Sequence, residues 1–112
     1  MIQIKFDCSK GFLTGFHMKG HADFAEAGKD IVCAAASIYS INTINSIEYL
    51  VGIEDSIYYD AEDGKIDFGI LTEKLSGKEK EQTELLMRSM ELAFISLRDE
   101  YNKYIKIYYE EV

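Results

Sequence analysis

Hydrophobic and polar residues alternate along the start of the chain in two short runs. The positions that form the apolar side of these runs are Ile2, Ile4, Phe6 and Cys8, followed by Phe12, Thr14, Phe16 and Met18. A period of two residues is typical of a strand that is buried on one face. The residues between the runs, 9–11, include a glycine and have the composition of a turn. The pattern therefore predicts two strands joined as a hairpin.

The next periodic segment is a helix over 31–51. It contains no Gly or Pro, Asp30 can cap its start, and Gly52 can end it. One face carries Cys33, Ser37, Ser40, Ile44, Ile47 and Val51, and a second seam carries Ile31, Ala34, Ile38 and Ile41. A helix that is apolar on more than one face is usually deeply buried or shares a subunit interface.

The second half of the chain repeats this alternation of strands and helix. Segments 56–60 and 65–71 flank 61–64, whose Asp-Gly pair is a strong signal for a tight turn. The segment from Gly77 to about Asp99 predicts a helix, and Ile105, Ile107 and Tyr109 predict a last strand. The buried stripe expected for that helix is Met87, Met90, Phe94, Leu97 and Tyr101. The order ββ–α–ββ–α–β predicts an α+β fold, a small mixed or antiparallel sheet with two helices packed on it.

Composition limits the classes of protein that fit this fold. The chain has 112 residues, of which 47% are hydrophobic, which suits one domain over 1–112 that needs neither disulfide nor metal to fold. A net charge of -8 disfavours nonspecific nucleic-acid binding. The N-terminal segment does not resemble a signal peptide, and no segment has the length of a membrane span. We therefore expect a cytoplasmic protein whose two cysteines are thiols.

The strongest candidate for chemistry is Cys33, together with His21. A cysteine at the start of a helix ionises more readily, because the N-terminus carries partial positive charge. A strand end and a helix start that meet across a short loop would bring His21 to the thiol, as in a Cys–His nucleophile. The backbone N–H groups of Cys33 and Ala34 could then serve as an oxyanion hole. The alternatives are a small cysteine packed in the core and a histidine in a surface loop.

Other residues near this pair have possible supporting roles. The first interpretation of Asp30 is an N-cap that fixes the start of the helix; its carboxylate could also orient His21. Ser37 lies one turn after Cys33 on the same face of the helix. Its hydroxyl could bond to the preceding turn or to the catalytic pair. Cys8 lies on the apolar side of the first predicted strand, so we expect it to pack in the core. The loop over 22–29 has little to anchor it and predicts a mobile lid; its marked residues are Ala22, Asp23, Phe24 and the hinge Gly28.

Zinc is a weaker alternative for the same region. His17, His21, Asp23 and Cys33 are possible ligands, but no metal-binding spacing links them. We expect no metal and no cofactor.

Two short segments resemble a known family signature. They are Gly20-His21-Ala22 and the run from Gly28 to Ser37, which contains Asp-x-Val-Cys-Ala-x-x-Ser. They closely resemble the bacterial ribosomal-processing cysteine proteases, the Prp family. The resemblance implies a homodimeric Cys–His endopeptidase with His21 and Cys33 as the catalytic pair and Asp30 and Ser37 at supporting positions. It also implies that the substrate is the N-terminal extension of large-subunit ribosomal protein twenty-seven, cut after an aromatic residue.

The sequence therefore leaves two hypotheses open. The first is a cytoplasmic cysteine endopeptidase, with the ribosomal extension as its peptide substrate and with no direct nucleic-acid or membrane partner. The second is a noncatalytic dimeric module that binds a ribosomal or assembly partner through the same groove. Fast thiol labelling of Cys33 that depends on His21 would favour the first.

Overall fold

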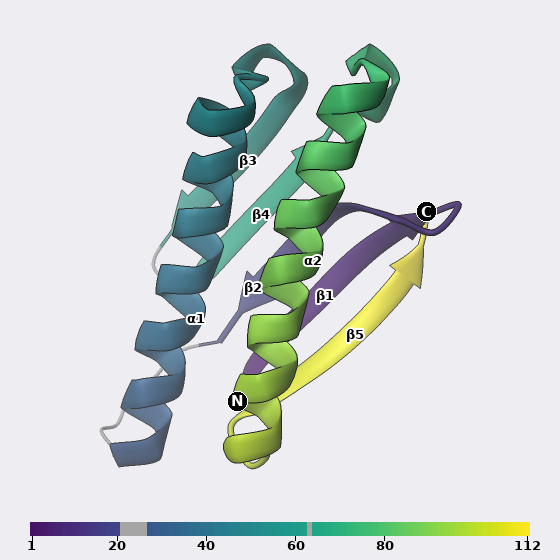
Figure 1. The fold of residues 1–112 in the computed structure, drawn as a ribbon. Coiled ribbons are helices and arrows are strands. Elements are labelled where there is room, and N and C mark those ends of the chain that lie inside the picture. The colour runs from purple at the N-terminus through teal and green to yellow at the C-terminus, as the bar shows by residue number, and fades with distance from the viewer. Residues whose placement is uncertain (21–26, 63) are drawn as a thin grey trace.

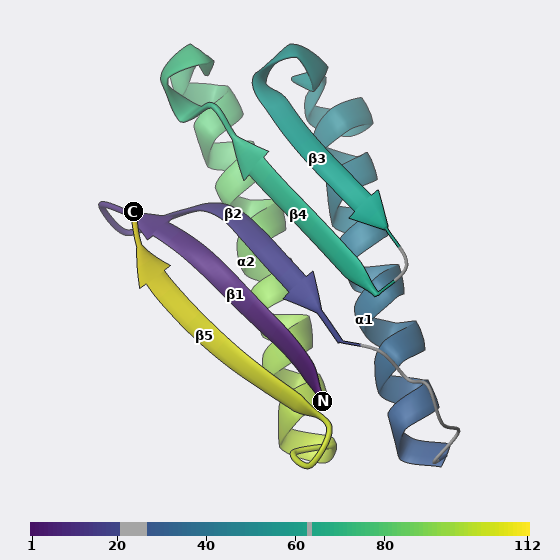
Figure 2. The same ribbon diagram turned by 180° about the vertical axis from the view of Figure 1, so that it is seen from behind.

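The fold consists of one sheet with both helices on the same side. The computed structural model describes residues 1–20, 27–62 and 64–112, with residues 27–30 as backbone only. The order of the main elements is the predicted ββ–α–ββ–α–β. Figure 1 shows the two helices lying across one face of the sheet, and Figure 2 shows the opposite face of the sheet uncovered.

The sheet has five strands in the order β3-β4-β2-β1-β5. The strands are β1 (Ile2–Ser9), β2 (Phe12–Lys19), β3 (Ile57–Glu62), β4 (Lys65–Ile70) and β5 (Ile105–Glu111), and the helices are α1 (Ala27–Asn45) and α2 (Gly77–Glu100). The predicted hairpins β1–β2 and β3–β4 are both antiparallel, whereas β5 lies parallel to β1. The sheet is therefore mixed, and β3 and β5 form its edges.

The first hairpin contains a bulge that changes which side chains are buried. Asp7 pairs with Gly15 but Cys8 pairs with Leu13, so Thr14 is the extra residue in β2. One extra residue moves the rest of the strand to the opposite face, because side chains alternate. Leu13 is consequently buried and Phe12 is 44% exposed. The prediction that Phe12 and Thr14 share the apolar side with Phe16 is wrong for this reason.

Helix α1 begins at Ala27, earlier than predicted. Gly28 and Asp30 therefore lie within the helix, and the interpretation of Asp30 as its N-cap and of Gly28 as a loop hinge is wrong. After α1 the chain continues as a π-helical segment over Ser46–Val51. It stops at Gly52, whose φ of 80° is the left-handed conformation expected of a glycine C-cap.

Only one side of α1 faces the sheet. Val32, Ala36 and Ser40 are fully buried along that side. The seam predicted from Ile31, Ile38 and Ile41 is instead 50%, 65% and 40% exposed, respectively. The two-faced pattern of the sequence thus corresponds to a helix that covers the sheet with one face and leaves an apolar face open.

Helix α2 follows the sequence closely. Ser76 and Glu79 form a reciprocal capping box at its start, and Met87, Met90, Phe94 and Leu97 of the predicted stripe are buried. Tyr101, the last residue of that stripe, lies just after the helix and is half-buried. Phe94 packs edge-on against Phe6 of β1 and against Tyr39 of α1, with ring centroids 6.3 and 5.7 Å apart. The core therefore lies between the sheet and the two helices.

No helix in the described part of the chain is long and apolar enough to cross a membrane.

Candidate active site

Cys33 and Ser37 lie on α1 beside a cavity of about 400 Å³. Cys33 is partly buried against the core and is a thiol rather than part of a disulfide. Ser37 is exposed, and its hydroxyl makes no hydrogen bond to any residue that the structure describes. Of the two alternatives for the Ser37 hydroxyl, the bond back to the preceding turn is therefore absent among those residues. A thiol and a hydroxyl one helical turn apart line the same cavity.

The opposite wall of the cavity comes from segments distant in the sequence. It includes Met18 and Gly20 at the end of β2 and Glu62, Gly64 and Lys65 at the turn between β3 and β4. Of these wall residues, the sequence singled out only Gly20, which precedes His21. The residues of the turn could not be placed at the site, because only the pairing of β2 with β4 brings that turn to α1. The Asp-Gly turn signal predicted the turn itself but gave no information about what it faces.

Gly20 fixes the end of β2 at the cavity. Its N–H donates to the carbonyl oxygen of Gly64 at 3.0 Å, which ties β2 to the turn between β3 and β4. Its φ is 139°, and an added Cβ would lie 2.6 Å from the carbonyl oxygen of Met1. Only glycine fits both the backbone angle and this contact. Gly20 is also the residue before His21, and it lines the same cavity as Cys33.

The position of Cys33 differs from the one that the sequence predicts. Because α1 begins at Ala27, Cys33 lies more than one turn into the helix. The unpaired N–H groups of a helix are those of its first four residues, and the effect of the helix dipole is strongest in the first turn. The N–H groups of Cys33 and Ala34 are therefore engaged within α1, so the predicted oxyanion hole from these two groups is wrong.

The other predicted site residues fall in or near the part of the chain that is not described. His21, Ala22, Asp23 and Phe24 lie outside the described residues, and of Asp30 only the backbone is described. The proximity of His21 to Cys33 and the mobility of the loop therefore stay predictions.

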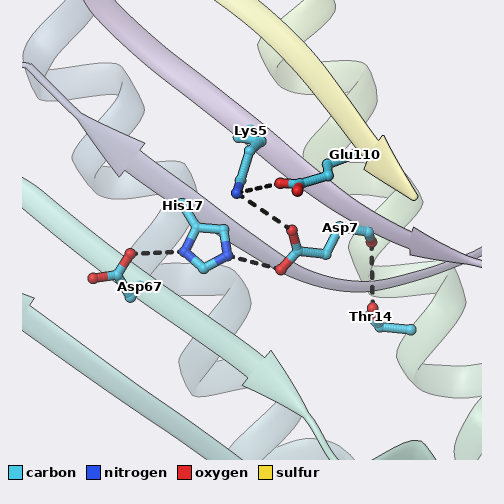
Figure 3. Close-up of polar contacts among 6 residues, drawn as sticks. All are labelled: Lys5, Asp7, Thr14, His17, Asp67 and Glu110. Carbon is cyan, nitrogen blue, oxygen red and sulfur yellow. Dashed lines mark hydrogen bonds and ion pairs between the residues drawn. The ribbon is translucent and has the colours of Figure 1, made fainter. Parts of the chain in front are cut away.

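The second histidine has a different environment, on the uncovered face of the sheet. Figure 3 shows the His17 ring between two carboxylates. Its Nε2 lies 2.7 Å from Asp7 Oδ2 on β1, and its Nδ1 lies 2.7 Å from Asp67 Oδ1 on β4. Both ring nitrogens are thus occupied, which argues against His17 as a zinc ligand. Hydrogen bonding to His17, aided by nearby Lys65, lowers the pKa of Asp67.

The second cysteine, Cys8, is a contrasting thiol. It lies on β1 and packs partly buried against the core, as its strand parity predicts. Burial, followed by the negative charge of Glu111, raises the pKa of the Cys8 thiol. A thiol with a raised pKa is a poor nucleophile near neutral pH. The two cysteines therefore differ in both location and environment.

Comparisons with known proteins match essentially the whole chain. The family model described as cysteine protease Prp matches residues 1–106. A Bacillus subtilis protein named ribosomal processing cysteine protease Prp is 30% identical over 109 residues, which cover 96% of each chain. The crystal structure of the Staphylococcus aureus protease Prp with a substrate peptide has a TM-score of 0.76 and 27% identity, covering 98% of this chain and 100% of that one.

A second Staphylococcus aureus Prp structure carries a covalently linked product peptide. It has a TM-score of 0.74 and 28% identity, again covering 98% of this chain and 100% of that one.

Proposed function

The chain belongs to the Prp family of cysteine proteases, and from this premise we propose that Cys33 and His21 are its catalytic pair. Three observations on this chain support the pair. Cys33 lines a cavity large enough to take part of a peptide, Ser37 adds an exposed hydroxyl beside it, and Gly20 brings the end of β2 to the same cavity directly before His21. Cys8, whose pKa is raised, is a poor alternative nucleophile.

In the proposed reaction, Cys33 attacks a peptide carbonyl. His21 takes the proton from the thiol, and Cys33 Sγ forms a bond to the carbonyl carbon, giving a tetrahedral intermediate. The C–N bond then breaks, and the imidazolium gives its proton to the leaving amine. Water, deprotonated by His21, hydrolyses the remaining thioester and releases the acid product and the thiol. A relative that holds a covalently linked product peptide supports such a covalent step.

The position of Cys33 within α1 affects how its thiol is activated. Because the thiol lies beyond the first turn of the helix, we attribute its activation mainly to His21 rather than to the helix dipole. The Ser37 hydroxyl is available to donate a hydrogen bond to the thiolate. Asp30 precedes Cys33 in α1 and is assigned the role of orienting His21.

We propose that the substrate is the N-terminal extension of large-subunit ribosomal protein twenty-seven. The name of the Bacillus subtilis relative refers to ribosomal processing, and a Staphylococcus aureus relative binds a substrate peptide. On this proposal the enzyme works in the cytoplasm, where the ribosomal protein is made. The part of the predicted loop that precedes α1 would contribute to covering the bound peptide.

We further propose that the protein is a homodimer, and that the open apolar face of α1 contributes to the interface. Ile31, Ile38 and Ile41 are all exposed along this helix. Exposed apolar side chains on one helix face are typical of subunit contacts.

A peptide-cleavage assay tests the proposal. The purified protein is incubated with a synthetic peptide that spans the extension and the first mature residues, and products are identified by mass spectrometry. Cys33→Ala should abolish cleavage while the fold persists, because alanine is a good helix residue. Cys8→Ala, the matched control, should keep activity with a modest loss of stability. Near-normal turnover by Cys33→Ala would disprove the assignment of the nucleophile.

A further inference from the structure

One edge of the sheet ends at the cavity beside Cys33. Strand β3 is an edge strand, and Figure 2 shows it along one side of the sheet, with β5 along the other. The last two residues of β3, Ala61 and Glu62, line the cavity that Cys33 and Ser37 also line. No residue of β5 lines that cavity. Of the two edges, β3 is therefore the one that leads to the proposed active site.

The outer side of β3 is open for pairing. The strand pairs with β4 in an unbroken register over its whole length, so it contains no bulge. Among the described residues, no backbone group is hydrogen-bonded to its other side. The strand contains no proline, and all of its residues after Ile57 are exposed. A straight, unpaired edge presents a row of N–H and C=O groups that another extended segment can bind.

The two faces of β3 carry different side chains. Tyr59 and Ala61 pair with buried residues of β4, so they lie on the helix side of the sheet, and both are exposed. Asp60 and Glu62 alternate with them and lie on the uncovered face. A strand paired with β3 would therefore have an apolar neighbour on one face and carboxylates on the other.

These two carboxylates have no cation of their own. Neither Asp60 nor Glu62 forms an ion pair with a described residue. Lys65 lies opposite Glu62 in the sheet, but its Nζ is 3.4 Å from Asp67 Oδ2. Asp67 lies opposite Asp60 and adds like charge there. The uncovered face of β3 therefore favours cationic side chains in a partner, and the net charge of -8 acts in the same direction.

A second copy of the chain is a poor partner for this edge. If β3 paired antiparallel with β3 of another copy, Asp60 and Glu62 of the two strands would lie opposite or diagonal to one another. Like charges in these positions are destabilising. A peptide with cations at alternate positions meets no such repulsion.

We propose that the substrate binds as an added strand along the free edge of β3, with its scissile bond at the cavity of Cys33. This inference rests on the proposed function. An added strand lies about 4.8 Å from its neighbour, so it runs beside β3 and reaches the cavity at Ala61 and Glu62. Main-chain hydrogen bonds hold the peptide. Its apolar side chains lie beside Tyr59 and Ala61, and the cationic ones that alternate with them lie beside the two carboxylates.

A scan of backbone N-methylation tests the strand pairing. Synthetic peptides that span the extension and the first mature residues each carry one N-methyl group, and their binding to Cys33→Ala is measured by fluorescence anisotropy. Alternate N–H groups of a strand point toward the same neighbour. N-methylation should therefore weaken binding on the order of tenfold at every second residue on one side of the scissile bond. The residues in between are the matched controls, and a scan without this period of two overturns the proposal.

Amide hydrogen exchange identifies the edge that is used. When about 90% of Cys33→Ala is bound to the unmodified peptide, amides on the free side of β3 should exchange on the order of tenfold more slowly. Those on the free side of β5, the other edge, should not change. Protection of β5 instead, or of neither edge, contradicts the proposal.

Charge exchanges test the face that carries the carboxylates. Lysine and glutamate are placed in turn at each peptide position, and lysine should bind roughly threefold more tightly at alternate positions. Asp60→Asn combined with Glu62→Gln should remove this preference. Glu100→Gln, at an exposed position at the end of α2, is the control and should retain it. A preference for lysine that survives the loss of both carboxylates would contradict their role.

Cleavage of the same peptide by the wild-type protein separates this inference from the proposed function. Cleavage without the period of two and without protection of β3 overturns strand addition and leaves the protease assignment in place. Binding along β3 without cleavage supports strand addition and contradicts the proposed substrate. A peptide that is neither bound nor cleaved overturns both.

Discussion

At the scale of single residues, the environment of each side chain decides its chemistry. Cys33 and Cys8 are both partly buried thiols, but Cys33 lines a cavity next to Ser37 and Gly20. Cys8 packs against the core, where burial and Glu111 raise its pKa. Reactivity toward an electrophile depends on the thiolate fraction and on access, so the two thiols should separate clearly in a labelling experiment.

The first prediction concerns the coupling of Cys33 to His21. In a Cys8→Ala background, His21→Ala should slow alkylation of Cys33 by iodoacetamide near neutral pH on the order of tenfold, because the imidazolium no longer stabilises the thiolate. The rate is measured across a pH series by mass spectrometry. His17→Gln in the same background is the control and should leave the labelling rate unchanged. Superimposable pH profiles with and without His21 would show that the two residues do not interact.

A second residue-scale prediction concerns Tyr109 at the edge of the sheet. Its hydroxyl donates to Glu91 Oε2 at 2.6 Å. Burial, followed by this bond to Glu91, raises the pKa of Tyr109 from 10.0 to about 12. As pH rises, Tyr109 loses its hydroxyl proton in the unfolded chain before it does so in the folded protein. Its contribution to stability is therefore complete below pH 10 and is lost as pH rises toward about 12.

An alkaline titration followed by tyrosinate absorbance checks this value. Tyr109→Phe should remove one late-titrating group from the profile. Glu91→Gln should bring the pKa of Tyr109 partway back, because burial remains while the carboxylate is gone. An unchanged late phase in Tyr109→Phe would contradict the assignment.

At the scale of elements, polar side chains link strands on the uncovered face of the sheet. Figure 3 shows His17 of β2 between Asp7 of β1 and Asp67 of β4, with Lys5 reaching toward Asp7 and toward Glu110 of β5. Lys5 Nζ lies 2.6 Å from Glu110 and 3.9 Å from Asp7. These contacts cross four of the five strands. They supply cross-strand attraction on a face that the helices do not cover.

The acid stability of the protein should depend on this cluster. The pKa of Asp67 is lowered in the folded state, first by the hydrogen bond to His17. As pH falls, Asp67 therefore takes up its proton in the unfolded chain before it does so in the folded protein. The stabilisation is complete above pH 3.8, the ordinary pKa of this group, and is lost as pH falls through the lowered pKa.

Urea unfolding at several pH values measures this effect. Asp67→Asn should lower the free energy of unfolding by about 1 kcal/mol at neutral pH, and its difference from the wild type should shrink below pH 4. Asp55→Asn, at an exposed position outside the cluster, is the control. A difference that stays constant down to strongly acidic pH would argue against a role for Asp67.

At the scale of the whole molecule, the arrangement of both helices on one side leaves two surfaces exposed. One is the polar face of the sheet, and the other is the apolar face of α1 with Ile31, Ile38 and Ile41. We expect the second to be covered by another copy of the chain.

Sedimentation equilibrium tests this expectation. Ile38→Asp should shift the protein from dimer to monomer, because a buried charge at the interface is costly. Leu85→Asp is the matched control, since Leu85 of α2 is similarly exposed, at 72% against 65% for Ile38. We expect no shift for Leu85→Asp. A wild-type protein that is monomeric at micromolar concentration would disprove the dimer.

The sequence by itself determined the features that depend on neighbouring residues. Alternation predicted β1, β2 and β5, the Asp-Gly pair that ends at Gly64 predicted the hairpin of β3 and β4, the apolar stripe of α2 predicted its buried face, and Gly52 predicted where the first helical stretch ends. The motif around His21 and Cys33 indicated the family that the comparisons confirm, and with it a protease rather than a noncatalytic module. Each of these signals is encoded within a few residues, where local backbone sterics and periodic burial act.

The tertiary structure decided what depends on residues that are distant in the chain. The pairing of β1 with β2 places the bulge at Thr14 and so exposes Phe12. The pairing of β2 with β4 brings Gly64 to the cavity beside Cys33. Packing on the sheet selects which of the two apolar faces of α1 is buried, and the helix extends back to Ala27 although Asp30 resembles a cap. Local propensity cannot specify these outcomes, because each is settled by the free energy of long-range contacts.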